Sequence, residues 1–369
     1  MTAELLERLE AEARSLGVVG MGVTGPEPFD EVRRTMDRRA ATGESADLGF
    51  TYKDRSRATT ILESYPSARS IVSVAWPYVP AAGSPARPAP GMGRVARFAE
   101  RNHYKSLRRV LDRLVATVES EGHAAWQLAD DDRLVDRAAA VRAGVGWWGK
   151  STMVLVPGAG PWVLLGSVVT DAALPRSEPT RRDCGTCAAC LPACPTGALV
   201  APGQIDARKC IAYWAQAPGV IPRRMRALMG DRLYGCDECL TACPPGHPVL
   251  GRATDVRGTV DLAEVLGLDD TTLMRRFSHF YVPRREARHL RRNAIIALGN
   301  VGGRSAFGVL AGYLGHPDWL LRAHAAWALQ ALDHPRSEEV LSEARRSEED
   351  PRVLAELEHE QYGIEPGLR

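Results

Sequence analysis

The two cysteine-rich runs of this chain constrain its structure more than any other feature. The first, CGTCAACLPACP, spans 184–195 and spaces four cysteines as C-x2-C-x2-C-x3-C; the second, CDECLTACPPG, spans 236–246 and holds three more. In bacterial ferredoxins, three cysteines of such a run bind one 4Fe-4S cluster and the fourth binds a second cluster. Because a metal cluster can replace a hydrophobic core, we expect the region around these runs to be rich in turns.

The spacing also predicts which cysteines share a cluster. A complete second run would place a cysteine at position 233, where the chain has Leu233, and Cys210 is the obvious substitute. Exchange of the fourth cysteines then uses all eight thiolates. Structural zinc is the alternative, but zinc sites usually offer two separated C-x2-C pairs. The predicted ligands are Cys184, Cys187, Cys190 and Cys243 for cluster one, and Cys194, Cys210, Cys236 and Cys239 for cluster two.

The fold class expected from the pattern is α+β in several domains. Before the cysteines, a helical segment at 104–120 alternates with apolar, β-rich runs at 70–76 and 162–170, and a Pro/Gly-rich loop spans 77–93. After them, LRRNAIIALGNVG and LRAHAAWALQALD superpose 31 residues apart, which predicts a HEAT-like pair of helical hairpins followed by a capping helix. The predicted domains are 1–171, 172–255 with the clusters, and 256–369 with the helical repeat.

Composition excludes few functions but indicates a location. The formal charge of +2 is too balanced to identify a nucleic-acid-binding protein, so any such prediction depends on local clusters. The N-terminal segment reads as an amphipathic helix with Leu5, Leu6 and Leu9 on one side and not as a signal peptide. No stretch is apolar enough to cross a bilayer. We expect a cytoplasmic protein with no membrane contact, where reduced thiols are available to bind metal.

Several segments together resemble the epoxyqueuosine reductase family, which is cobalamin-dependent and acts in transfer-RNA modification. The resemblance rests on RLVDRAAAVRAGVGWWGKSTMVLV, the two cysteine runs with ARKCIAYW and YGCDEC, and RRNAIIALGN. It implies a nitroreductase-like α/β domain that binds cobalamin, a ferredoxin-like domain with two 4Fe-4S clusters and a HEAT-like domain. It also implies reduction of epoxyqueuosine to queuosine at the wobble position of tRNA.

The family's general acid is an aspartate that matches Asp130 here. Opening of an epoxide leaves charge on oxygen, so a proton donor is required. An aspartic acid is protonated at neutral pH only where its pKa is raised, and burial together with like charges at Asp131 and Asp132 would raise it. A solvated turn is the alternative for DDDR.

Other residues are candidates for cofactor binding. Arg97 and Tyr104 match family positions, although Asn102-His103-Tyr104-Lys105 displaces a histidine of the family pattern. Glycines in GVGWWGKST would let the backbone approach a corrin ring, and a glycine-rich hairpin with core tryptophans is the alternative. Asp237 and Glu238 lie between cluster ligands and would face the corrin or solvent. The predicted contacts are Arg97, Tyr104, Asp130, Trp148, Lys150, Ser151, Asp237 and Glu238.

An arginine-rich segment, YVPRREARHLRRN, opens the repeat region. On a helix its arginines would form a phosphate-binding stripe for RNA, whereas a solvated charged face is the alternative. The predicted RNA contacts are Arg284, Arg288, Arg291 and Arg292.

The expected partners are tRNA that carries epoxyqueuosine in the anticodon and an external electron donor of the flavodoxin or ferredoxin type, with the protein itself a monomer. Two other functions remain open from the sequence. A related cobalamin and iron-sulfur reductase would act on a different substrate, as reductive dehalogenases do, and a non-catalytic iron-sulfur protein would only transfer electrons.

Overall fold

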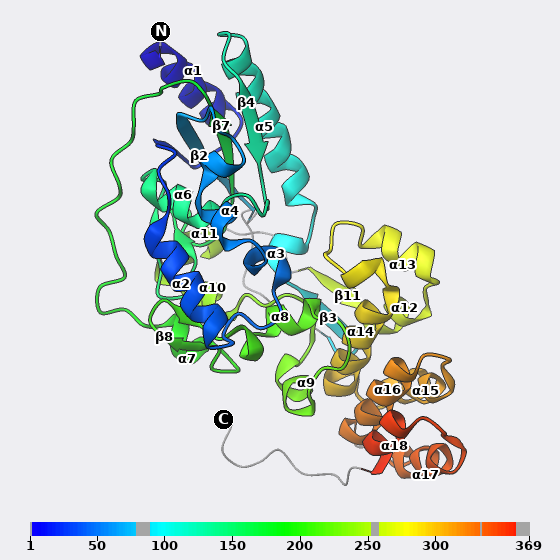
Figure 1. The fold of residues 1–369 in the computed structure, drawn as a ribbon. Coiled ribbons are helices and arrows are strands. Elements are labelled where there is room, and N and C mark those ends of the chain that lie inside the picture. Colours follow the sequence, from blue (N-terminus) through cyan, green and yellow to red (C-terminus); the bar gives the residue numbers. More distant parts are fainter. Residues whose placement is uncertain (1, 79–88, 252–257, 333, 359–369) are drawn as a thin grey trace. The chain divides into compact units, whose positions relative to one another are not determined.

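The computed structural model describes residues 2–78, 89–251, 258–332 and 334–358. These form two compact units built from interleaved segments (Figure 1). Unit 1 contains 1–84, 101–210 and 237–255, whereas unit 2 contains 85–100, 211–236 and 256–369. The chain therefore leaves unit 1 after the first cysteine run and returns to it within the second.

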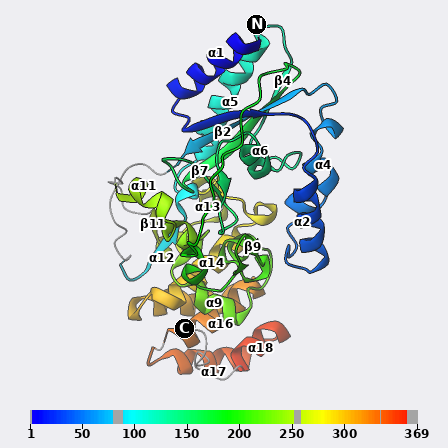
Figure 2. The same cartoon turned by 90° about the vertical axis from the view of Figure 1, so that its left-hand side faces the viewer.

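Unit 1 is built on a four-stranded antiparallel sheet in the order β1-β2-β7-β4 (Figure 2). The central strands β2 (Ser70–Pro77) and β7 (Val163–Thr170) are the apolar runs expected from the sequence. The outer strands are β1 (Gly20–Thr24) and β4 (Ala125–Leu128). Central strands covered on both faces are nearly continuous in apolar residues, and β7 follows this pattern.

Helices cover both faces of this sheet. Helix α5 (His103–Glu119) packs so closely on β7 that a Cβ added at Gly166 would lie 2.8 Å from Leu111 Cδ1. Ala75 lies on the other face and packs with Ala140 of α6 (Asp136–Arg142). Neighbouring residues of a strand point to opposite faces, so α5 and α6 lie on opposite sides. Helix α1 (Thr2–Ser15) packs on α5 and buries Leu5 and Leu9, as its amphipathic pattern predicts.

The cysteine-rich part of unit 1 consists of short elements. They include α7 (Cys190–Ala193), the hairpin β8–β9 (Leu199–Ala201 and Gln204–Ile205), η3 (Ala207–Lys209) and α10 (Glu238–Thr241). Helix α10, from the second cysteine run, packs on α7 from the first. The second run, from Asp237 onward, is thereby brought beside the first within unit 1.

Unit 2 joins a small sheet to stacked helices. Its strands are β10 (Arg232–Tyr234), β3 (Met92–Val95) and β11 (Thr259–Asp261), in that order. The repeat expected from the sequence is confirmed: α14 (Ala287–Val301) and α16 (Trp319–Ala331) pack together, and a Cβ at Gly299 would lie 2.7 Å from Ala328 Cβ. The remaining repeat helices are α15 (Phe307–Gly312), α17 (Ser337–Ser347) and α18 (Pro351–Glu358).

Two expectations need comment. The Pro/Gly-rich loop at 77–93 lies largely outside the described residues. The sequence predicts a single capping helix after Ser337, but the chain forms two helices, α17 and α18. Proline favours the first position of a helix, and Pro351 is the first residue of α18. In the described parts of the chain, no helix has the length and apolar character needed to cross a membrane.

Candidate active site and cluster ligands

The four cysteines predicted for cluster one are gathered in unit 1. Cys243 is buried, and burial together with the nearby thiols of Cys184, Cys190 and Cys187 raises its pKa to about 11. Burial and the thiols of Cys184 and Cys187 likewise raise the pKa of Cys190. Four thiols that repel one another's charge need a positive partner, which iron supplies. This side-chain set fits a four-iron cluster.

Cys194, the fourth cysteine of the first run, is held separately. Its Sγ accepts the Ala198 N–H at 3.2 Å and lies 3.5 Å from the hydroxyl of Thr196. Burial raises the pKa of Cys194, but hydrogen bonds from Thr196, Leu199 and Ala198 outweigh it, and the net pKa is lowered. Donors directed at a sulfur stabilise a thiolate, which is the form that binds a cluster.

No set of three His, Cys, Asp or Glu side chains among the described residues is close enough to coordinate a single metal ion. A four-iron cluster distributes its thiolates over separate iron atoms, so its ligands stand farther apart than those of one zinc ion.

The glycine-rich segment 144–152 packs against the first cysteine run. Its strand β5 (Trp147–Trp148) pairs with β6 (Val154–Leu155), just after the segment, in a short hairpin. The backbone N–H of Lys150 donates to Cys184 Sγ at 3.4 Å, and its Nζ donates to the Gly185 carbonyl at 2.6 Å. Trp147 is buried with Cys243, whereas the side chain of Trp148 is 43% exposed. These two donors of Lys150 are directed at the first cysteine run, while its carbonyl accepts from the Gly203 N–H at 2.8 Å.

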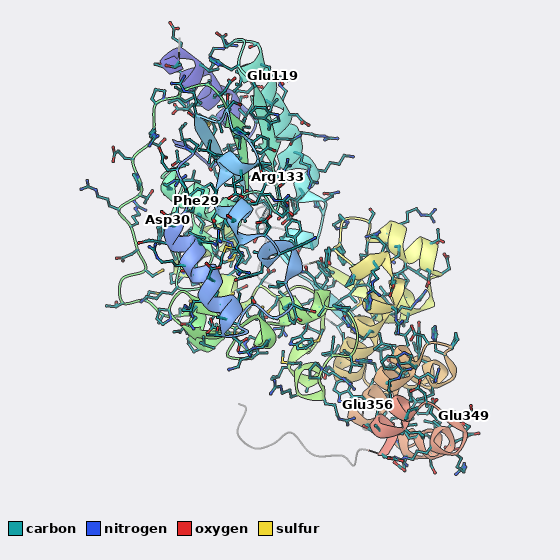
Figure 3. All side chains as sticks on the ribbon, viewed as in Figure 1. Phe29, Asp30, Glu119, Arg133, Glu349 and Glu356 are labelled. Carbon is teal, nitrogen blue, oxygen red and sulfur yellow. The ribbon has the colours of Figure 1, made fainter. Side chains whose placement is uncertain are left out.

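Asp130 lies on the turn between β4 and α6, in an uncommon backbone conformation. Its φ of 52° is in the left-handed region, which aspartate adopts more readily than most residues. Strained backbone of this kind is often found at functional sites. Figure 3 labels Arg133 on the same turn.

The Asp130 turn borders a small hollow of about 120 Å³. Asp130 lines this hollow and is exposed, although burial of part of its carboxyl environment raises its pKa. An exposed aromatic ring, Phe50 of α3 (Gly49–Tyr52), stands at the same hollow. The lining residues are Phe50, Thr51, Ala58, Asp130, Asp131, Asp132, Leu134, Val135, Asp136 and Arg137.

The surroundings of Asp130 favour its protonated form. Burial raises the pKa of Asp130, and the charge of Asp131 adds to this, although Arg108 of α5 opposes it. The two other aspartates of the turn are neutralised by arginines: Asp131 pairs with Arg133 at 2.5 Å, and Asp132 pairs with Arg57 at 2.5 Å. Among the described residues, Asp130 is the one carboxyl of the DDD run that forms no such ion pair, and its pKa is raised, so the turn distinguishes it from its neighbours.

Tyr104 is brought to the same place from α5. Burial, followed by the charges of Asp130 and Asp136, raises its pKa, which shows that the three side chains interact. The guanidinium of Arg108 lies 5.7 Å from the centre of the Tyr104 ring and donates to the Ala129 carbonyl at 3.5 Å. The structure therefore brings together two predicted site residues that are far apart in sequence.

Two residues of this site were missed by the sequence analysis. Asp136 lines the hollow, and Arg137 donates to the carbonyl of Thr152 at 2.9 Å, which links α6 to the glycine-rich hairpin. An Asp-Arg pair at the start of a helix is common on protein surfaces, so the sequence carried no signal for them.

The other predicted cofactor contacts are dispersed. Arg97, in unit 2, is 2% exposed on the 3-10 turn η2 (Arg97–Ala99), and Ser151 is buried in unit 1. Asp237 is buried at the N-terminal end of α10, which Glu238 begins. Their role in cofactor binding stays a prediction.

The predicted arginine stripe needs a correction. Arg292 is fully buried and donates to the carbonyls of Ala217 and Gly219, and Arg291 is 7% exposed and donates to Leu268 and Asp270. These two side chains hold the interior of unit 2 and cannot reach RNA. The four arginines do not form one exposed helix face, because other residues of unit 2 cover this face of α14. In addition, Arg284 precedes the helix and has a φ of 51°. Arg284 is 85% exposed, and Arg288 pairs with Asp318 at 2.7 Å.

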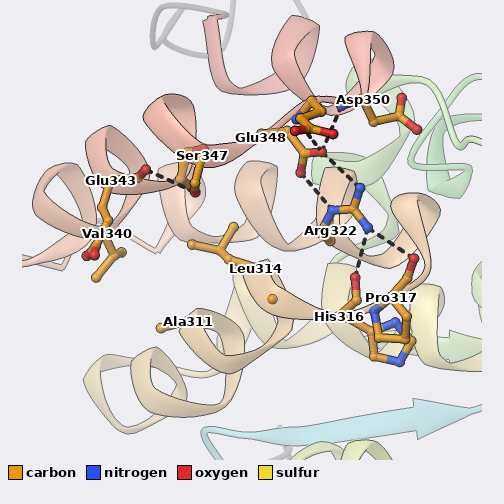
Figure 4. A pocket seen from close by; sticks show the side chains of 13 residues that line it. Ala311, Leu314, His316, Pro317, Arg322, Val340, Glu343, Ser347, Glu348 and Asp350 are labelled. Atoms are coloured by element: carbon orange, nitrogen blue, oxygen red, sulfur yellow. Dashed lines mark hydrogen bonds and ion pairs between the residues drawn. The ribbon is translucent and has the colours of Figure 1, made fainter.

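A larger hollow, of about 830 Å³, lies among the repeat helices (Figure 4). Arg322 crosses it to form a two-pronged ion pair with Glu348 at 2.7 and 2.9 Å. Its remaining charged lining is mostly acidic, with Glu343, Glu349 and Asp350, and it contains no cysteine. This hollow has neither the ligands for a cluster nor the positive charge that would attract RNA.

Comparisons with known proteins bear on both parts of the site. The model of a 4Fe-4S double cluster binding domain matches residues 183–246, and that of HEAT repeats matches 284–360. The chain is 32% identical to epoxyqueuosine reductase of Bacillus subtilis (strain 168), over 96% of this chain and 95% of the relative. It is 29% identical to that of Staphylococcus aureus, with 96% of both chains covered.

Solved structures agree with these relatives. A crystal structure of epoxyqueuosine reductase with a tRNA-Tyr epoxyqueuosine-modified stem loop superposes with a TM-score of 0.88 at 31% identity, covering 96% of this chain and 97% of the other. The structure of the Bacillus subtilis enzyme with a catalytic aspartate loop swung out of the active site gives the same TM-score, identity and coverage.

Proposed function

Because the chain belongs to the epoxyqueuosine reductase family, we propose that it reduces epoxyqueuosine to queuosine at the wobble position of tRNA. The reaction removes the epoxide oxygen as water and consumes two electrons and two protons. The observation that carries this proposal is the presence, in one unit, of four gathered cysteines and an aspartate whose pKa is raised by burial. A non-catalytic electron carrier would have no use for the second of these features.

The eight cysteines are proposed to bind two 4Fe-4S clusters. The match to a double cluster binding domain supports the number of clusters. Cluster one is assigned to the gathered set, Cys184, Cys187, Cys190 and Cys243. Cluster two is assigned to Cys194, Cys210, Cys236 and Cys239 on the spacing of the two runs.

Cobalamin is proposed as the second redox cofactor. It supplies electrons to the substrate from low-valent cobalt. The hollow beside Asp130, at about 120 Å³, fits the epoxide and a few neighbouring atoms but is too small for a corrin ring. The hollow therefore fits the reacting part of the substrate. Residues outside the hollow would have to hold the corrin ring. The candidates are Arg97, Tyr104, Trp148, Lys150, Ser151, Asp237 and Glu238.

Asp130 is proposed as the general acid. Asp130 lines the hollow and is accessible from it, and the raised pKa of its carboxyl group, caused first by burial, favours the protonated form that an acid needs. As the carbon–oxygen bond breaks, a proton placed on the leaving oxygen removes the charge that would otherwise develop there. Tyr104, held by α5 near the same turn, is proposed to orient the substrate through its neutral phenol.

The HEAT-repeat region is proposed to contact tRNA. Of the predicted arginines, Arg284 and Arg288 retain this role because they reach the surface of unit 2. We further propose three domains, 1–171, 172–255 and 256–369, of which the first is nitroreductase-like. The protein is proposed to be a cytoplasmic monomer that receives electrons from an external donor of the flavodoxin or ferredoxin type.

The test is mass spectrometry of tRNA nucleosides. Epoxyqueuosine-containing tRNA is incubated with the cluster-loaded chain, cobalamin and a strong reductant, and the nucleosides are then released. We expect epoxyqueuosine to be replaced by a nucleoside lighter by one oxygen atom. Unchanged epoxyqueuosine, with both clusters and cobalamin present by absorption, would exclude this substrate and favour a related reductase with another one.

A further inference from the structure

The indole N–H of Trp147 is enclosed in unit 1 without an acceptor. Trp147 is 7% exposed, and its Nε1 atom is buried and has no hydrogen-bond partner among the described residues. A buried donor that stays unpaired is costly, and the large majority of such groups in proteins are paired. The position of this N–H therefore needs an explanation.

A second tryptophan in the same unit shows the usual arrangement. Trp162 is fully buried, and its indole N–H donates to the Gly246 carbonyl at 3.3 Å. Gly246 lies three residues after Cys243, and its own N–H donates to the Cys243 carbonyl at 2.9 Å. One indole N–H near this turn is thus satisfied by the protein, whereas the N–H of Trp147 is not.

The Trp147 ring packs against cysteines that are proposed to bind cluster one. It forms one buried group with Leu155 and Cys243, and Cys184 packs against that group. Cys184 is the first cysteine of one run, and Cys243 is the last cysteine of the other. A 4Fe-4S cluster on these thiolates brings sulfur atoms that accept hydrogen bonds into the surroundings of the ring. The buried indole N–H therefore fits a bound cluster.

The hairpin that carries Trp147 directs another donor at the same cysteine. The backbone N–H of Lys150 donates to Cys184 Sγ at 3.4 Å. The hairpin is also closely packed beside Trp147, because a Cβ added at Gly146 would lie 2.3 Å from the Leu155 carbonyl oxygen. Such close packing restricts the backbone that carries the indole. The hairpin is therefore a fixed source of donors beside the first cysteine run.

The charges around this site are mostly positive. The Lys150 Nζ donates to the Gly185 carbonyl at 2.6 Å, and the Arg182 guanidinium lies 5.8 Å from the centre of the Trp147 ring. Asp183 opposes them, with its Oδ1 accepting the Gly185 N–H at 2.6 Å. Net charge and hydrogen bonds to sulfur are two of the properties that set the reduction potential of an iron-sulfur cluster. Since reduction adds negative charge, N–H donors and cations favour the reduced form.

We propose that Trp147 sets the potential of cluster one: its indole N–H donates to a sulfur of the cluster and, together with the Lys150 N–H, stabilises the reduced form. The inference rests on the proposed function in one respect, that cluster one is a 4Fe-4S cluster. In the step concerned, the cluster gains one electron from the external donor. No bond forms or breaks, and the proton stays on the indole nitrogen.

The first test is a redox titration of the cluster-loaded full chain, followed by electron paramagnetic resonance without cobalamin or tRNA. Trp147→Phe keeps an aromatic ring and removes the N–H. The equilibrium constant for reduction of cluster one should fall about three- to tenfold, because a hydrogen bond to a charged acceptor is lost. That fall moves the midpoint by about 30 to 59 mV to lower potential. The signal of cluster one is identified as the one that Cys243→Ala removes.

The matched control is Trp76→Phe. The Trp76 Nε1 atom is also buried without a hydrogen-bond partner among the described residues, but its ring packs beside Gly17, after α1. This variant should leave both midpoints unchanged. The midpoint of cluster two should also stay unchanged in Trp147→Phe, because its proposed ligand Cys194 has donors of its own in Ala198 and Thr196.

The second test detects the hydrogen bond in the unaltered chain. Tryptophan is isotope-labelled at the indole nitrogen, and electron nuclear double resonance of the reduced clusters should show a coupling to an indole nitrogen. Trp147→Phe should abolish this coupling, whereas Trp76→Phe should retain it. If Trp147→Phe fails to assemble its clusters, the presence or absence of the coupling in the wild type decides alone.

The inference and the proposed function fail in different ways. Absence of the coupling from the wild type would overturn the inference, and so would an equal shift of the midpoint in Trp76→Phe. Neither result depends on whether the chain reduces epoxyqueuosine. A chain that shows the coupling and the shift but leaves epoxyqueuosine unchanged would refute the proposed substrate and support the role of Trp147.

Discussion

Arg292 offers a sharp test of the structure, because it was expected to bind RNA and is instead enclosed. Its guanidinium donates to the carbonyls of Ala217 at 2.9 Å, Gly219 at 2.5 Å and Trp214 at 3.2 Å, and the side chain is fully buried. The variant Arg292→Met keeps most of the aliphatic stem and removes every donor. Three carbonyl groups, one buried and two partly buried, then lose this partner.

The magnitude follows from these contacts. An unsatisfied buried polar group costs about 1 to 3 kcal/mol, and partial repair by water and relaxation reduces the sum for three. We therefore expect a loss of about 3 to 5 kcal/mol in the free energy of unfolding, similar to the cost of removing one partner from a buried charged network. For a unit of this size, that corresponds to a fall of about 6 to 20 °C in the melting temperature.

The assay is thermal and urea unfolding followed by circular dichroism, with Arg284→Met as the matched control. The Arg284 side chain is 85% exposed. Its replacement should change stability by less than about 0.5 kcal/mol. If Arg292→Met were as stable as the control, the buried guanidinium would not be holding the 211–236 segment to α14, and the correction to the RNA stripe would lose its basis.

Three further predictions concern the cofactors, the acid and the RNA. Anaerobic reconstitution should give about eight iron and eight sulfide ions per chain. Cys243→Ala should reduce both numbers to about half and remove one cluster signal in electron paramagnetic resonance. A content of about one zinc ion per chain would contradict the cluster assignment. Asp130→Asn should lower the single-turnover rate of epoxide reduction by about 10²- to 10⁴-fold. The control Asp132→Asn should lower that rate less than about tenfold, because the Asp132 carboxylate is already paired with Arg57. Because burial raises the pKa of Asp130, wild-type activity should persist to higher pH than an ordinary aspartic acid allows and then fall. The double variant Arg284→Gln/Arg288→Gln should weaken tRNA binding and reduce the slope of log affinity against log salt by about one to two, with cobalamin binding unchanged; an unaltered salt slope would show that both side chains are only solvated.

The sequence predicted the parts of this protein that have a local signature. Apolar runs located β2 and β7, amphipathic spacing located α1 and α5, and the repeated LR-x2-A-x2-AL pattern located α14 and α16. The cysteine spacing predicted that Cys243 would join the first run, and the structure gathers these thiols. Each of these signals depends on a periodicity or a fixed spacing within one segment.

What the sequence could not predict depends on contacts between segments. Arg291 and Arg292 look like a charged surface until residues of 211–236 and 262–270 are packed over them. Asp130 gives no sign in the sequence of its left-handed conformation, and Asp136 looks like an ordinary first-turn aspartate until both are found to line one hollow. Neither a covering layer nor a single backbone dihedral leaves a pattern in composition or spacing.

The interleaving of the two units would give the proposed cluster one the character of a covalent cross-link. Its proposed ligands lie on either side of 211–236, a stretch that belongs to unit 2, so coordination by Cys190 and Cys243 would close a loop that carries part of the other unit's core. During synthesis the site cannot be completed until that stretch has left the ribosome and the chain has returned. Closure of a long loop stabilises a fold chiefly by restricting the unfolded chain, as a disulfide does. Iron supply would then govern how much of the protein reaches its native state as well as how much of it carries electrons.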